Sequence, residues 1–152
     1  MKVKALVGSG DKIGLFTLPF VLFGVVLNLL LPSLFSVGGP PLVVTVIALL
    51  VLLPGVTMWI WSVVLILTYV PHKQLITSGP YALVKHPLYT SVALLVLPWL
   101  GLLLNTWLGV VLGITLYIAS RLFAPEEEAL LAKTFGPAWD AYRVVAQVRR
   151  IW

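Results

Sequence analysis

The residues best suited to chemistry lie in one polar stretch, His72–Ser91, between long hydrophobic blocks. Gly79-Pro80 predicts a turn that starts a short helix, because proline is preset for the first position of a helix. His86-Pro87 predicts the end of that helix, because a residue before proline is pushed out of the α region. A break between helices therefore carries two tyrosines, a lysine and a histidine, namely Tyr81, Tyr89, Lys85 and His86. We interpret the stretch as half of a ligand site.

Three glutamates, Glu126–Glu128, follow the last hydrophobic block and form the other half. Two hydrophobic segments lie between the halves, and a hairpin of two helices would bring its ends together. Aromatic rings stabilise cations, carboxylates pair with ammonium groups, and the helix N-terminus at Pro87 suits a carboxylate. S-adenosylmethionine has an adenine ring, a sulfonium, an ammonium and a carboxylate, so we predict it as the cofactor. Each feature alone has a structural alternative: interfacial tyrosines, a helix-capping histidine and glutamates that favour a helix dipole.

The composition defines the setting of this site. Hydrophobic residues make up 61% of the 152 residues and charged residues 10%, against roughly a quarter charged in soluble domains. This predicts an integral membrane protein with a single domain over residues 1–152. The chain has no cysteine and no run of basic residues. We therefore predict neither a metal site nor a nucleic-acid partner.

Four uncharged blocks predict an all-α integral membrane fold with four transmembrane helices, at residues 14–35, 42–69, 88–104 and 107–123. The first two helices form a membrane frame (residues 1–71), and residues 72–152 form the cofactor-binding half with a helical hairpin. A cleaved signal peptide is the alternative for the first block. In the hairpin, Gly101 and Gly109-x-x-x-Gly113 predict a close approach of the two helices.

Beyond residue 123, hydrophobic residues recur at three- and four-residue spacing, which predicts short amphipathic surface helices interrupted at Gly136-Pro137. Every Lys and Arg lies in a basic leader (residues 1–12), in residues 71–87, or from Arg121 onward. The turns at 36–41 and 105–106 contain none. By the positive-inside rule, this multi-pass chain has both termini, its surface helices and its active site on the cytoplasmic side.

At this point two motifs show a family resemblance. The interval resembles the G-P-Y-x-x-x-R-H-P-x-Y signature of the isoprenylcysteine carboxyl methyltransferase and phospholipid methyltransferase superfamily, in the form Gly79-Pro80-Tyr81-x-x-x-Lys85-His86-Pro87-x-Tyr89. The later segment resembles the E-E-x-x-L-x-x-x-F-G-x-x-Y-x-x-Y tail of the same superfamily, in the form Glu127-Glu128-x-x-Leu131-x-x-x-Phe135-Gly136-x-x-Trp139-x-x-Tyr142. The two motifs and the hairpin between them cover roughly the C-terminal half. Lys85 and Trp139 stand where the superfamily has arginine and tyrosine.

The resemblance implies an enzyme that transfers a methyl group from S-adenosylmethionine to a lipophilic acceptor. That acceptor is an isoprenylcysteine carboxylate, a phospholipid amine or another small lipid. The implied cofactor contacts are Lys73, Gln74, Leu75, Ile76, Tyr81, His86, Pro87, Leu88, Tyr89, Glu127 and Glu128. The candidate catalytic residues are His86, which would take a proton from an amine acceptor, and Arg121. Isoprenylcysteine enzymes hold their substrate with an arginine at the position that is Phe123 in this chain. Arg121 is the nearest arginine to that position.

Two other functions compete with methyl transfer. A membrane reductase of the sterol-reductase type, using NADPH, resembles the C-terminal region distantly. A non-catalytic membrane scaffold is the third hypothesis. Binding of S-adenosylmethionine or of NADPH to the purified protein distinguishes the three.

Overall fold

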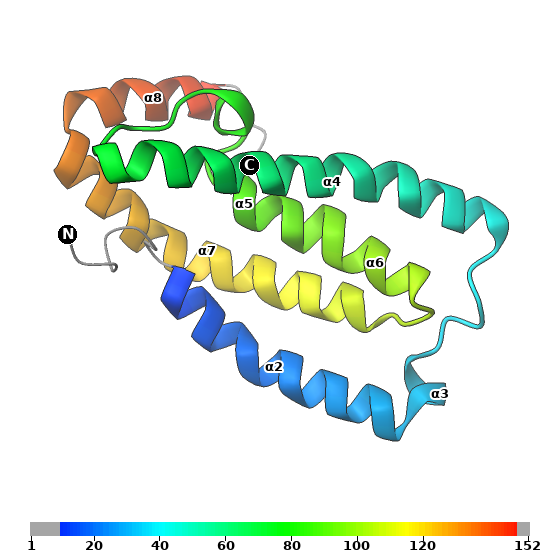
Figure 1. The fold of residues 1–152 in the computed structure, drawn as a ribbon. Helices are drawn as coiled ribbons and strands as arrows, with labels where there is room; N and C mark the ends of the chain where they lie inside the picture. The colour runs from blue at the N-terminus through cyan, green and yellow to red at the C-terminus, as the bar shows by residue number, and fades with distance from the viewer. Residues whose placement is uncertain (1–9, 149–152) are drawn as a thin grey trace.

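A computed structural model describes residues 10–148, and this part of the chain is all-helical, with no strand beyond an isolated bridge (Figure 1). Most of the predicted basic leader and both chain ends lie outside these residues. The long helices are α2 (Gly10–Leu30), α4 (Leu42–Tyr69), α7 (Leu108–Phe135) and α8 (Pro137–Val148). The shorter elements are α3 (Pro32–Phe35), η1 (Val70–His72), η2 (Gly79–Ala82), α5 (Pro87–Thr90), η3 (Ser91–Val96) and α6 (Leu97–Leu103).

Within residues 10–148, three helices are long and apolar enough to cross a membrane: Gly10–Leu30, Leu42–His72 and Leu108–Phe135. They confirm three of the four predicted membrane helices. The elements α5, η3 and α6 form one apolar rod, Pro87–Leu103, which is shorter than the roughly 20 residues of a typical crossing. The chain is therefore an integral membrane protein with three candidate spans and one shorter apolar rod beside them.

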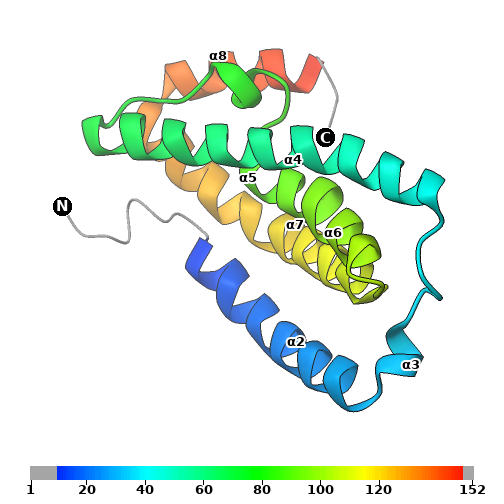
Figure 2. The same cartoon turned by 45° about the vertical axis from the view of Figure 1, so that its right-hand side comes forward.

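The four rods pack in the order α2, α7, α5–α6 and α4. Helix α2 packs against α7, α7 packs against the α5–α6 rod, and that rod packs against α4. Figures 1 and 2 show α2 and α4 on opposite sides of the central pair. The pair α7 and α5–α6 is thus the centre of the bundle.

Glycines allow the central pair to approach closely. A Cβ atom on Gly101 would lie 2.7 Å from the Gly109 Cα, and one on Gly109 would overlap the carbonyl oxygen of Leu97. Gly113 has the same relation to the carbonyl of Ala93. No larger side chain fits at such a contact. The predicted close approach at these three glycines is confirmed.

Helix α7 extends beyond the predicted end at residue 123, and that prediction is wrong. The helix continues through Pro125 to Phe135. A proline inside a helix costs about 3 kcal/mol of stability. The following residues, Glu126–Ala132, are strong helix formers. In addition, Lys12 pairs with Glu126 and Lys85 pairs with Glu128. The break predicted at Gly136-Pro137 is confirmed: Gly136 has a φ of 51°, and Pro137 starts α8.

The two turns at the end of the bundle remote from α8 are joined to each other. Asn105 accepts a 2.7 Å hydrogen bond from the Gly39 amide and donates one to the Ser36 hydroxyl. Trp107 stacks on Phe35 with a ring-centre distance of 4.9 Å, and its amide donates to the Phe35 carbonyl. The α2–α4 connection is therefore fastened to the α6–α7 connection.

Candidate functional site

The polar interval turns back along α4 as soon as that helix ends. Lys73 adopts a left-handed conformation with a φ of 54°, its amide donates to the Val70 carbonyl, and the Gln74 amide donates to the Tyr69 carbonyl. This is the hydrogen-bond pattern of a Schellman helix end. Farther on, Gly79 has a φ of 60°, and a Cβ there would lie 3.1 Å from the ring of Trp61 on α4. The interval therefore runs over α4 and lies beside α8 (Figures 1 and 2).

A cavity of about 370 Å³ lies between the interval, the start of α5, the C-terminal part of α7 and α8. Ligand pockets in proteins range from roughly 300 to 1,000 Å³, so the volume suits a small ligand. Its walls are formed by Ile66, Val70, Lys73, Gln74, Leu75, Ile76, Tyr81, Lys85, His86, Leu88, Tyr89, Glu127, Leu130, Leu131, Thr134, Phe135, Trp139 and Tyr142.

The structure brings the two predicted halves of the site together. All the predicted cofactor contacts line this cavity except Pro87 and Glu128. Pro87 is fully buried at the start of α5, next to the lining residues His86 and Leu88. Glu128 contacts other side chains of the protein instead. The interval and α7 thus line the same cavity, although they are far apart in sequence.

Several lining residues were not among the predicted site residues. Leu131, Phe135, Trp139 and Tyr142 belong to the tail motif and recur at three- and four-residue spacing, which was the available signal. Ile66 belongs to a helix that was assigned to the membrane frame alone. No sequence pattern identified it, because its immediate neighbours Leu65 and Leu67 are equally apolar.

Arg121 lies apart from the cavity. Its side chain is exposed on α7 and does not line the wall. Phe123 faces α2, where its ring meets the ring of Phe16 at a centre distance of 6.0 Å and an angle of 67°. Residues two positions apart on a helix point about 200° away from each other, which separates these two side chains.

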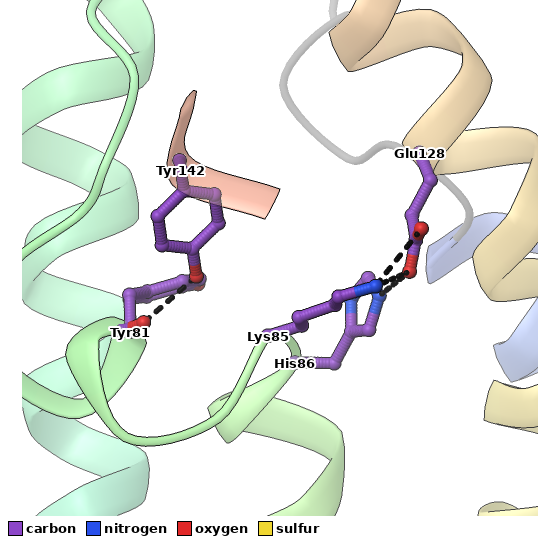
Figure 3. A network of polar contacts seen from close by, with 5 residues as sticks. All are labelled: Tyr81, Lys85, His86, Glu128 and Tyr142. Atoms are coloured by element: carbon purple, nitrogen blue, oxygen red, sulfur yellow. Dashed lines mark hydrogen bonds and ion pairs between the residues drawn. The ribbon is translucent and has the colours of Figure 1, made fainter. Parts of the chain in front are cut away.

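Glu128 is at the centre of a cluster with two residues of the interval (Figure 3). Both carboxylate oxygens lie 3.3 Å from Lys85 Nζ, and one lies 3.4 Å from His86 Nε2. The three side chains are only 17–27% exposed. The predicted lysine and histidine are therefore both bound to the glutamate run on α7.

A second contact joins the interval to α8. The Tyr142 hydroxyl donates a 2.7 Å hydrogen bond to the Tyr81 carbonyl (Figure 3). Burial, followed by the negative charge of Glu128, raises the pKa of Tyr142 to about 12. Burial, followed by the charge of Glu127, also raises the pKa of Tyr81. Both phenols are therefore neutral at physiological pH, and Tyr142 remains a donor.

The cavity combines an apolar wall with charged side chains of both signs. Most of its wall is aliphatic or aromatic, while Glu127 and Lys73 provide opposite charges. Such a wall suits a ligand that has a flat ring and a charged end with both an amine and a carboxylate. The described part of the chain is thus a helical membrane protein with a cavity of small-molecule size at one end of its bundle.

The comparisons with known proteins identify the family. The model of the isoprenylcysteine carboxyl methyltransferase (ICMT) family matches residues 41–133, which is more than half of the chain. The match includes α4, the interval, the α5–α6 rod and most of α7. This chain belongs to the isoprenylcysteine carboxyl methyltransferase family, and so to the membrane methyltransferases. No curated protein and no solved structure matches it.

Proposed function

We propose that this protein transfers a methyl group from S-adenosylmethionine to a lipophilic acceptor at the cytoplasmic face of its membrane. The observation that carries the proposal is the single cavity in which the interval, with Tyr81 and Tyr89, meets Glu127 on α7. Membership of a methyltransferase family agrees with this reaction.

The lining residues fit the parts of the cofactor. The Glu127 carboxylate would pair with the ammonium group, and the Lys73 ammonium would pair with the carboxylate. Tyr81 and Tyr89 would face the adenine ring and the sulfonium. Leu75, Ile76 and Thr77 lie outside any helix, and their backbone amides and carbonyls would be the groups that contact adenine.

When bound, S-adenosylmethionine supplies an electrophilic methyl group on its sulfonium. An in-line nucleophile forms a bond to that carbon while the carbon–sulfur bond breaks and leaves its electron pair on sulfur. The protein mainly has to align the two reactants and exclude water. The apolar residues Leu88, Leu130 and Leu131 serve the second purpose because they cover the wall with groups that do not bind water.

The acceptor determines whether a base is needed. A carboxylate or thiolate attacks without losing a proton, whereas an amine has to release one. His86 lines the cavity and is the residue that would receive that proton. Arg121 is exposed and lies outside the cavity, so its guanidinium would pair with an acidic acceptor headgroup only where that headgroup extends beyond the cavity.

Calorimetry on the purified protein tests the cofactor. We expect S-adenosylmethionine and S-adenosylhomocysteine to bind with one site per chain, and NADPH not to bind. Binding of NADPH alone would favour a reductase, and binding of neither would favour a scaffold. Incubation with labelled-methyl S-adenosylmethionine and a membrane lipid extract then tests transfer, and the labelled lipid identifies the acceptor.

A further inference from the structure

Two adjacent glutamates on α7 have different surroundings. Glu127 lines the cavity, while Glu128 does not and instead contacts Lys85 and His86 (Figure 3). Neighbouring residues on a helix point about 100° apart, so one side chain can face a ligand while the next faces the protein. One turn of α7 thus contributes Glu127 to the cavity and Glu128 to the contacts with Lys85 and His86.

The contacts of Glu128 fix the point at which the interval becomes a helix. Lys85 and His86 directly precede Pro87, which is fully buried and begins α5. Leu88 and Tyr89 follow at once and line the cavity. A shift of His86 along α7 would therefore move Tyr89 relative to Glu127, and a misplacement of about 1 Å can cost roughly 100-fold in rate.

The same helix contains an ion pair that serves as an internal comparison. Lys12 on α2 pairs with Glu126, but these side chains are 55% and 57% exposed. Lys85 and Glu128 are 17% and 27% exposed. Water screens the first pair and reaches the second much less, so only the second restrains its partners strongly.

We propose that Glu128 is a positioning residue, which holds Lys85 and His86 so that the start of α5 faces Glu127 across the cavity. It acts through these two residues and does not contact the cofactor. The inference rests on the proposed function, because it assigns a role in the same site.

A double-mutant cycle on the full chain tests this assignment. The variants are E128Q, K85Q and the double variant K85Q/E128Q, and the measured quantity is the Kd of S-adenosylhomocysteine by calorimetry. We expect each single variant to bind roughly 10- to 100-fold more weakly, by analogy with the loss of a residue that orients a metal ligand. The double variant should bind no more weakly than the single ones, because the two residues act as a unit. The control E126Q, in the exposed pair, should bind as the wild type does.

A variant with the two charges exchanged, K85E/E128K, tests the contact between positions 85 and 128 in a second way, because both positions stay charged. It keeps opposite charges at the two positions but takes the carboxylate away from His86, so we expect its affinity to recover only the part of the loss that comes from the Lys85 contact. The melting temperature of each variant shows that binding was measured on folded protein.

The outcomes separate this inference from the proposed function. Wild-type protein that does not bind S-adenosylhomocysteine overturns both. Wild-type binding with an unaffected E128Q variant overturns the positioning role alone. Losses that multiply in the double variant would show that Lys85 and Glu128 act independently, and they would also overturn the positioning role.

Discussion

Tyr142 on α8 donates a 2.7 Å hydrogen bond to the backbone carbonyl of Tyr81 in the polar interval. Both residues line the cavity. Helix α8 joins α7 through Gly136, where a Cβ would meet no atom within 4 Å. The hydrogen bond therefore joins α8 to the polar interval, and each of these elements lines part of the cavity.

Removal of the Tyr142 hydroxyl should loosen this connection. We expect Y142F to lose about 0.5–1.5 kcal/mol of stability, the usual net value of one hydrogen bond, and to bind S-adenosylhomocysteine several-fold more weakly. Thermal unfolding and calorimetry measure the two effects. The control is Y69F, since Tyr69 lies outside the cavity. If both variants bind equally well, α8 is held in place by its other contacts.

Glu127 should be essential for binding the cofactor but not for folding. Replacement by alanine removes a charged partner of the ligand, and a hydrogen bond to a charged group is worth about 1.5–3 kcal/mol. We therefore expect affinity to fall by roughly 10- to 150-fold, with little change in melting temperature. E126A, at an exposed position one residue earlier, is the matched control. Unchanged S-adenosylmethionine affinity in E127A would contradict the site assignment.

The contact between α7 and the α5–α6 rod should not tolerate a methyl group. A Cβ at Gly109 overlaps the Leu97 carbonyl, so we expect G109A to destabilise the protein by about 1–3 kcal/mol, as overpacking usually does. G14A on α2 meets no atom within 4 Å and should be neutral or slightly stabilising, because alanine favours helix more than glycine does. Thermal unfolding in detergent compares the two variants. A stable G109A would mean that the rods can separate at little cost.

The orientation in the membrane can be tested because the chain has no cysteine of its own. Single cysteines at Val37, Ser78 and Leu104, all exposed, are separated by α4 and by the α5–α6 rod. We expect a membrane-impermeant maleimide to label V37C and L104C from outside intact cells, and S78C only after the membrane is opened. Labelling of S78C and L104C from the same side would show that the rod does not cross, and labelling of S78C from outside would reverse the proposed topology.

Much of the arrangement could be predicted from the sequence because a few residue types have strong local effects. Pro87 and Gly136 predict helix boundaries that the structure has, since proline removes a donor and glycine permits a positive φ. The apolar block at Leu42–Tyr69 has the same bounds in sequence and structure. The meeting of Lys85 with the glutamate run followed from a hairpin that returns the chain to the same end of the bundle.

Other features depend on tertiary contacts and could not be predicted in this way. The end of the uncharged block at Phe123 suggested the end of a helix, but side-chain contacts on both sides of Glu127 stabilise the continuing α7. Residues Ser91–Val96 form a π-helical stretch just before Pro98, where the helix lacks a donor, and no hydrophobic period predicts it. The different surroundings of Glu127 and Glu128 depend on the rotation of α7, which the sequence alone does not define.

The joined turns at the far end of the bundle have a mechanical consequence. Asn105 and Trp107 tie the α2–α4 connection to the α6–α7 connection, so all four rods are restrained relative to one another there. A rod that is held at one end and tilts slightly moves farthest at its other end, in proportion to its length. The pairs Lys12–Glu126 and Lys85–Glu128 join the rods at that other end, so they oppose tilting at the point where it would change the width of the cavity most.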